Sequence, residues 1–268
     1  MFWNRGDVWR AVLLPVACLI VGYGAWLLVL EPFGGPIDPY NDVANVPTVA
    51  LGRVLPEVGF ALVIIGFVWS MGWFSRLFGR QPIGGRWWMW TAPVLLVCAS
   101  LAVLATNDYT LYSTGTIVLI GVVSLLTGFY EETLMRGAVV LMLRAGRHSE
   151  WVVTLLSSLI FAVLHVANLV GSDDGRSVAL TVAFAFPFGV GMYLTLRASG
   201  NLIWPILVHS LYDLAVFLAT GWAGEPGNKT LELLSDGAVI LVGVIGLIFV
   251  RGKVQLVAKP PALTSAAP

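Results

Sequence analysis

Charged residues are scarce in this sequence. Lys, Arg, Asp and Glu together make up 11% of its 268 residues, and the acidic and basic side chains balance to a formal net charge of zero. A soluble domain carries about 25% charged residues, so this chain lacks the polar surface that a soluble domain needs. The zero net charge also argues against a nucleic-acid partner.

Cysteine is also scarce, and two common hydrolase motifs are missing. The two cysteines, Cys18 and Cys98, both stand in apolar runs, which fits packing better than a disulfide or a metal site. Neither Gly-x-Ser-x-Gly nor His-Glu-x-x-His occurs in the sequence, so the serine-hydrolase elbow and the common zinc-protease helix are excluded. What remains is 58% hydrophobic residues with a mean hydropathy of +0.86, which is typical of a multi-pass membrane protein.

Eight apolar runs have about the length that crosses a hydrocarbon core of ~30 Å. They are approximately Trp9–Leu30, Val54–Trp73, Trp88–Ala105, Thr116–Leu143, Trp151–Val170, Val178–Leu196, Leu202–Trp222 and Leu233–Val250. The sequence therefore predicts an all-α transmembrane bundle of about eight spans. We expect one integral-membrane domain over residues 1–258 and a disordered tail over 259–268. The fourth run is over-long and could tilt, extend beyond the bilayer or bend near Gly128.

Basic residues predict the orientation. With the N-terminus inside, the inner segments hold eleven Lys and Arg and the outer segments hold only three, which are Arg53, Arg176 and Lys229. This asymmetry favours cytoplasmic N- and C-termini in a multi-pass protein of the cell membrane. A seven-span arrangement, without the last run, is the alternative.

Polar side chains interrupt three of the runs at a similar depth. They are Glu131, Glu132 and Arg136 in the fourth run, His165 in the fifth, and His209 and Asp213 in the seventh. Counted at about 1.5 Å per residue from the ends of the runs, these groups fall in one layer. Ionisable residues inside a membrane are costly and mark candidate functional sites. Glu57 stands near the outer end of the second run, where we expect water exposure, and is left outside the site.

Helical phase separates the two glutamates. Glu132 and Arg136 are four residues apart and can pair, either as a structural ion pair or within a site. Glu131 points about 100° away and is free for another role. A carboxylate beside a neutral imidazole is what general-base activation of water requires. His209 and Asp213 share a face, and could also be a pair that only fixes a histidine tautomer.

The three motifs together resemble the CPBP family of intramembrane proteases, over residues 116–222. This family, grouped with the metalloproteases, comprises the CAAX prenyl endopeptidases, bacteriocin-processing and self-immunity proteins, and Abi-like membrane proteins. The motifs stand here as Glu131-Glu132-x-x-x-Arg136, Phe161-x-x-x-His165 and His209-x-x-x-Asp213.

The resemblance implies an endopeptidase with assigned roles for these residues. Glu131 would be the general base, with His165 helping to hold and activate the water. His209 and Asp213 would lie near the oxyanion. The supporting residues would be Glu132, Arg136 and Phe161.

Position 213 departs from the prenyl endopeptidase pattern, where an Asn would donate a hydrogen bond to an oxyanion. An ionised Asp cannot donate. Asp213 is therefore protonated, or orients His209, or helps to bind a metal. A zinc ion at Glu131, His165 and His209 is one option, and a metal-independent mechanism is preferred.

The expected partners are the lipid bilayer and a peptide or protein substrate, with a lipidated or membrane-bound substrate as an option. We expect water and substrate to enter from the cytoplasmic side, through a mouth bounded by Arg144, Arg147 and Arg197. Two other functions stay open. The polar layer could be a packing network in a non-catalytic immunity or partner-binding protein, or a relay in a proton-coupled transporter.

Overall fold

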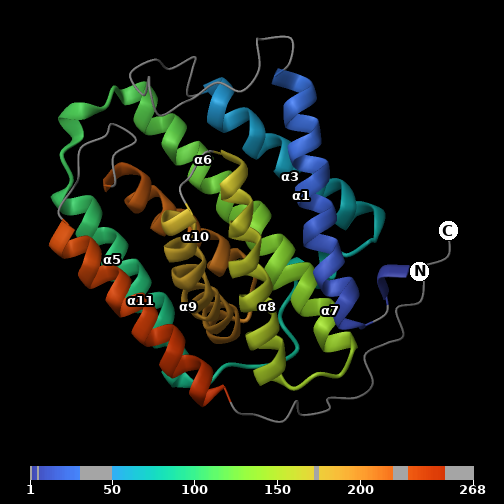
Figure 1. Ribbon diagram of the computed structural model, residues 1–268. Helices are drawn as coiled ribbons and strands as arrows, with labels where there is room; N and C mark the ends of the chain where they lie inside the picture. The colour runs from blue at the N-terminus through green and yellow to red at the C-terminus, as the bar shows by residue number, and fades with distance from the viewer. Residues whose placement is uncertain (1, 5, 31–49, 172–174, 220–228, 251–268) are drawn as a thin grey trace.

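The computed structural model describes residues 2–4, 6–30, 50–171, 175–219 and 229–250. These residues form helices joined by short turns, and no strand occurs among them (Figure 1). The predicted all-α fold is therefore confirmed. The tail predicted to be disordered, 259–268, lies outside the described residues.

The long helices follow the predicted runs in order. They are α1 (Val8–Leu30), α3 (Leu55–Ser70), α5 (Thr91–Thr106), α6 (Thr114–Glu132), α8 (Glu150–Leu164), α9 (Gly175–Ser199), α10 (Ile203–Ala219) and α11 (Lys229–Phe249). By length and composition, five helical stretches could cross a membrane, and three shorter apolar helices cover the remaining runs. The number of spans and the side on which the termini lie stay predictions.

The fourth run forms one helical stretch from Thr114 to Ala145. Its α-helical part, α6, continues through Gly128 and ends at Glu132. A π-helical segment, η6 (Thr133–Val139), follows, and then the short helix α7 (Val140–Ala145). The irregularity in this run is thus a π-helix directly after the glutamate pair. Such segments occur frequently at functional sites.

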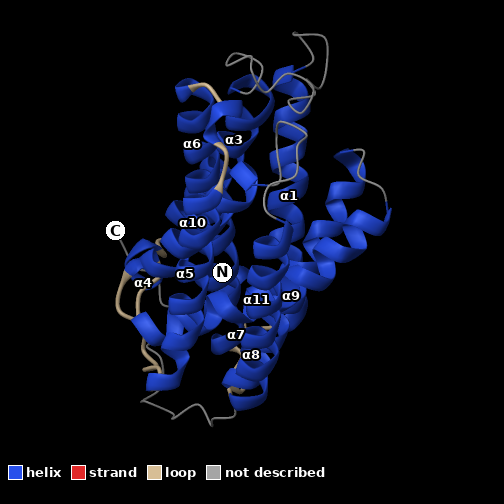
Figure 2. Ribbon diagram, turned by 90° about the vertical axis from the view of Figure 1, so that its left-hand side faces the viewer, coloured by secondary structure: helices blue, strands red, loops and turns tan. Residues whose placement is uncertain are grey.

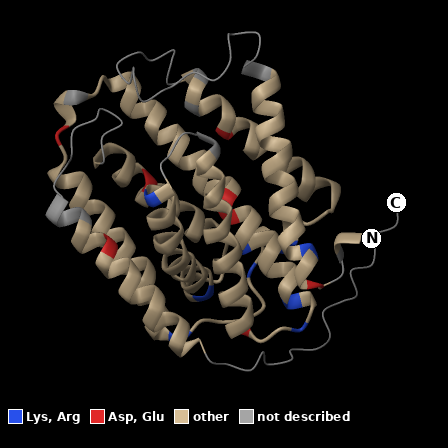
Figure 3. Ribbon diagram, in the orientation of Figure 1, with Lys and Arg blue, Asp and Glu red and all other residues tan. Residues whose placement is uncertain are grey.

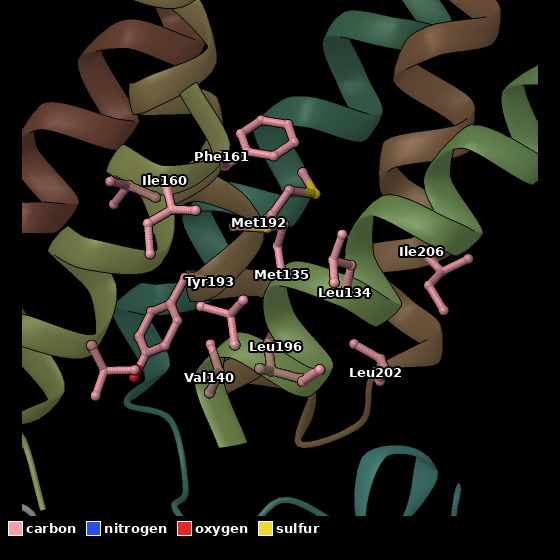
Figure 4. Packing of buried hydrophobic residues seen from close by; sticks show 14 of the residues in the cluster. Leu134, Met135, Val140, Ile160, Phe161, Met192, Tyr193, Leu196, Leu202 and Ile206 are labelled. Carbon is pink, nitrogen blue, oxygen red and sulfur yellow. The ribbon is translucent and has the colours of Figure 1, made fainter. Parts of the chain in front are cut away.

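The centre of the bundle is formed by η6 and the second half of α9, whose residues are almost all buried, and by one buried face of α8. Figure 4 shows Met135 of η6 beside Met192 of α9, with Phe161 of α8 above them. Seen from the side, most helices run along one common direction (Figure 2). Their outward faces carry large apolar residues such as Leu28, Trp69 and Leu233, which are 73%, 76% and 72% exposed. This exposed apolar surface fits an integral membrane protein.

Candidate active site

Glu132 forms the buried centre of a charged cluster. Its Oε1 atom accepts a hydrogen bond from Nδ1 of His209 at 2.8 Å and lies 3.0 Å from Nη1 of Arg136. The side chains of Glu132 and Arg136 are both 0% exposed. Arg136 also donates from Nη2 to the carbonyl oxygen of Gly189, at 2.8 Å. The ion pair predicted from helical phase is therefore confirmed, and it extends to α10.

His209 turns its other nitrogen toward two further carboxylates. Its Nε2 atom lies 3.7 Å from Oε2 of Glu131 and 3.5 Å from Oδ2 of Asp213. The side chains of Glu131 and Asp213 are 20% and 14% exposed, in contrast to Glu132. The two neighbouring glutamates thus occupy different sides of His209, with Glu132 on the closed side and Glu131 on the accessible side.

His165 reaches this cluster through a phenylalanine ring. It begins the 3₁₀ segment η7 (His165–Gly171), directly after α8, and its Nδ1 lies 2.9 Å from the carbonyl oxygen of Phe161. Because a carbonyl only accepts, Nδ1 carries a proton, and in the neutral ring the lone pair is therefore on Nε2. The Phe161 ring packs edge-on against His165 at 4.8 Å and against His209 at 6.1 Å. The structure therefore brings Glu131, His209 and Asp213 together and places His165 across Phe161 from His209.

Arg136 also packs over the Phe161 ring, 4.6 Å from its centroid. A guanidinium over an aromatic face is attracted by the ring quadrupole. Phe161 thus contacts three of the candidate residues, which fits the predicted packing role. Figure 3 shows how few charged residues the described helices contain, and that most Lys and Arg lie toward the lower end of the bundle.

The proposed zinc ligands do not fit a metal site in this arrangement. A catalytic zinc needs three protein ligands at about 2.0–2.3 Å from one point. Within the described ranges, no three His, Cys, Asp or Glu side chains are grouped in that way. Nδ1 of His209 is engaged by Glu132, and His165 packs against the Phe161 ring, which lies between it and His209. We therefore derive no step through a metal at Glu131, His165 and His209.

Gly128 explains how α10 comes close enough to deliver His209. A Cβ atom at Gly128 would stand 2.9 Å from the backbone oxygen of Ile206 and 2.9 Å from the backbone nitrogen of Ser210. These distances are shorter than a carbon atom tolerates, and backbone atoms cannot rotate away. Glycine at this position thus allows the most extensive helix contact in the bundle, between α6 and α10.

Replacing Gly128 with Ala should therefore push α10 away from α6. We expect a loss of about 1–3 kcal/mol in the free energy of unfolding, as for other overpacked sites. The measurement is the unfolding midpoint of the purified protein in a denaturing detergent series. Gly121→Ala, on the same helix and with open space around it, is the matched control and should leave the midpoint unchanged or slightly higher. Equal midpoints for both variants would contradict this account.

Two residues near the site escaped the sequence analysis. The hydroxyl of Tyr130 donates to Oε1 of Glu131 at 3.2 Å. Glu57 was expected to be water-exposed, and this is wrong, because it is half-buried and interacts electrostatically with Tyr130. Neither contact has a sequence signal, since adjacent residues on a helix do not face each other and α3 is distant from α6 along the chain.

The arginines expected to line a cytoplasmic mouth are mostly engaged elsewhere. Arg144 donates from Nε and Nη2 to the two carboxylate oxygens of Glu150, at 3.1 and 2.9 Å. Arg197 donates to Glu150 at 2.9 Å, and the hydroxyl of Tyr193 donates to the same carboxylate. The side chains of Arg144, Arg197 and Glu150 are only 11%, 9% and 3% exposed. The interpretation of Arg144 and Arg197 as an open mouth is therefore wrong, while Arg147 is exposed.

In a comparison with known proteins, part of the chain matches one family model. Residues 113–215 match the family model described as "Type II CAAX prenyl endopeptidase Rce1-like". No curated protein and no solved structure matches the chain. The matched segment contains every candidate site residue from Glu131 to Asp213, and it leaves out α1, α3, α5 and α11.

Proposed function

We propose that this chain, which belongs to the CAAX protease (CPBP) family through its residues 113–215, is an intramembrane endopeptidase whose base is Glu131. The predicted family and peptidase class are confirmed by the family match. One observation carries the choice of Glu131. Glu131 is the more exposed of the two carboxylates at Nε2 of His209, at 20% against 14% for Asp213, whereas Glu132 is fully buried and already paired with Arg136.

The proposed reaction uses the two sides of His209. A water molecule beside Glu131 gives a proton to the carboxylate and attacks the carbonyl carbon of the scissile peptide bond. In its protonated form, His209 donates from Nε2 to the carbonyl oxygen as negative charge develops there. The Glu132 contact to Nδ1 holds the imidazole in this orientation. The C–N bond of the scissile peptide then breaks, as the carbonyl re-forms and Glu131 returns the proton to the leaving amine.

His165 and Asp213 have secondary roles in this proposal. The lone pair on Nε2 of His165 accepts a hydrogen bond from the water or from the substrate amide. Asp213, at 3.5 Å from Nε2 of His209, orients the ring between turnovers. This role removes the conflict between an ionised Asp and an oxyanion, because the oxyanion is bound by His209.

Peptide cleavage by the purified full-length protein in lipid nanodiscs tests the proposed function. The probes are a farnesylated peptide that ends in Cys-aliphatic-aliphatic-Met, the same peptide without the lipid, and a mixture of synthetic segments from membrane proteins. We expect a defined pair of products by mass spectrometry, with one ¹⁸O atom in the new carboxylate when the reaction runs in H₂¹⁸O. Nanodiscs from the same host without the protein are the control.

The set of probe peptides that is cleaved identifies the substrate class. Cleavage of the farnesylated peptide alone assigns a lipidated substrate, and cleavage of both peptides shows that the lipid is not required. The absence of products from every probe would contradict the endopeptidase and favour a packing network among the same residues.

A further inference from the structure

Glu131 is held from its own helix by Tyr130. The phenolic hydroxyl donates to Oε1 at 3.2 Å, while Oε2 is the oxygen that faces His209 at 3.7 Å. The two oxygens of the carboxylate thus have separate partners on opposite sides. A base must stand within hydrogen-bond reach of the proton that it abstracts, so the orientation of this carboxylate matters for the rate.

Tyr130 is in turn fixed by helices outside the family-matched segment. Its ring stacks on Phe60 of α3, with centroids 5.2 Å apart and planes inclined by 22°. Phe60 packs edge-on against Tyr23 of α1 at 5.6 Å. Aromatic pairs at these separations add about 0.5–1.5 kcal/mol beyond their buried area. The three rings form a continuous row from α1 through α3 to the residue that holds Glu131.

Gly22 of α1 makes room for the middle ring of this row. A Cβ atom at Gly22 would stand 2.1 Å from the Cε1 atom of Phe60 and 2.3 Å from its Cδ1 atom. Phe60 cannot keep its place if Gly22 gains a methyl group, because it lies between two other rings. Gly24, two residues further along α1, has open space around it.

We propose that Tyr130 is a positioning residue for Glu131, and that the aromatic row Tyr23–Phe60–Tyr130 lets α1 and α3 set the orientation of the base. This inference rests on the proposed function, because it assumes that Glu131 acts on water. It adds a residue that the three sequence motifs do not contain. It also gives two helices outside residues 113–215 a part in the reaction.

Tyr130→Phe tests the hydroxyl alone. The ring and its stacking on Phe60 are kept, and only the donor to Glu131 is removed. Loss of a hydrogen bond to a charged group corresponds to a fall in kcat of about ten- to a hundredfold, with KM and the unfolding midpoint unchanged. A merely structural Tyr130 would shift the midpoint and leave kcat intact, and that result would overturn the proposal.

Gly22→Ala and Gly24→Ala test the aromatic row without touching the site. Gly22→Ala displaces Phe60 and should lower kcat in the same direction as Tyr130→Phe. Gly24→Ala is the matched control on the same helix, and its kcat should equal that of the wild type. Equal kcat values for the two alanine variants would show that α1 has no influence on the base.

Infrared spectroscopy separates a failure of this inference from a failure of the proposed function. The difference spectrum between wild type and Glu131→Gln isolates the carboxyl band of Glu131, and the same difference is recorded in the Tyr130→Phe and Gly22→Ala backgrounds. We expect the band to shift in both backgrounds and to stay in place with Gly24→Ala. An unshifted band with Tyr130→Phe would overturn the proposal even if peptides are cleaved. A shifted band without cleavage of any peptide would reject the endopeptidase and retain the Tyr130–Glu131 contact.

Discussion

Glu131→Gln should lower the rate of peptide cleavage by about a hundred- to ten-thousandfold, the range that general-base catalysis contributes. The amide has the shape of the carboxylate but cannot take a proton from water. The protein should remain folded, because the Glu131 side chain is 20% exposed and lies outside the buried Glu132–Arg136 pair. The measurement is the initial rate with the best probe peptide, together with the unfolding midpoint.

Glu132→Gln is the matched control for this prediction, since it makes the same change one residue further along the helix. Here the buried Arg136 loses its charged partner, and His209 loses the carboxylate at Nδ1. Breaking a buried ion pair costs about 3–5 kcal/mol, so this variant should lose stability as well as activity. A normal cleavage rate in Glu131→Gln would remove the base assignment, and so would equal stability losses in the two variants.

Glu150→Ala should destabilise the fold by about 3–5 kcal/mol, because it leaves Arg144 and Arg197 buried without their shared carboxylate. The bonds that would be lost also join several elements. Arg144 further donates to the side chain of Gln81, and Arg197 to the carbonyl oxygen of Gly84, both at 2.8–2.9 Å. Glu150 thus ties the loop before α5 to α7, α8 and α9. The free energy of unfolding in a detergent series measures this effect.

Arg76→Ala provides the comparison for Glu150→Ala. Arg76 lies on the short helix α4 (Phe74–Phe78) and its side chain is exposed. Removal of an exposed charge should change the free energy of unfolding by less than about 0.5 kcal/mol. If Glu150→Ala were as mild as Arg76→Ala, the buried ion network would contribute nothing to stability.

The buried charges were predictable where they depend on local helix geometry. Glu132 and Arg136 are four residues apart, so their contact follows from the repeat of the helix, and the direction of Glu131 follows from the same repeat. Arg136 lies within the π-helical segment, and its Nη1 atom still comes within 3.0 Å of Oε1 of Glu132. The three motifs also predicted the family resemblance, and all of them lie within the residues that match the family model.

Contacts between distant helices could not be predicted in this way. The stacking of Tyr130 on Phe60 joins α6 to α3, and hydropathy does not say which helices are neighbours. The roles of Arg144 and Arg197 were misjudged for a related reason. The distribution of Lys and Arg predicts orientation without regard to partners, and it does not indicate that Glu150 binds both arginines.

The Glu132–Arg136 pair has a consequence for how the protein is made. Both members belong to one helical stretch, whereas their third partner, His209, is 77 residues further along the chain. An isolated charge at the centre of an inserting helix costs about 2.5–3.5 kcal/mol at the translocon. The stretch from Thr114 to Ala145 can therefore enter the bilayer with these two charges already neutralising each other, before the ribosome has synthesised α10. Biogenesis of the site can then proceed in two steps, with insertion of the acidic helix first and completion by His209 afterwards.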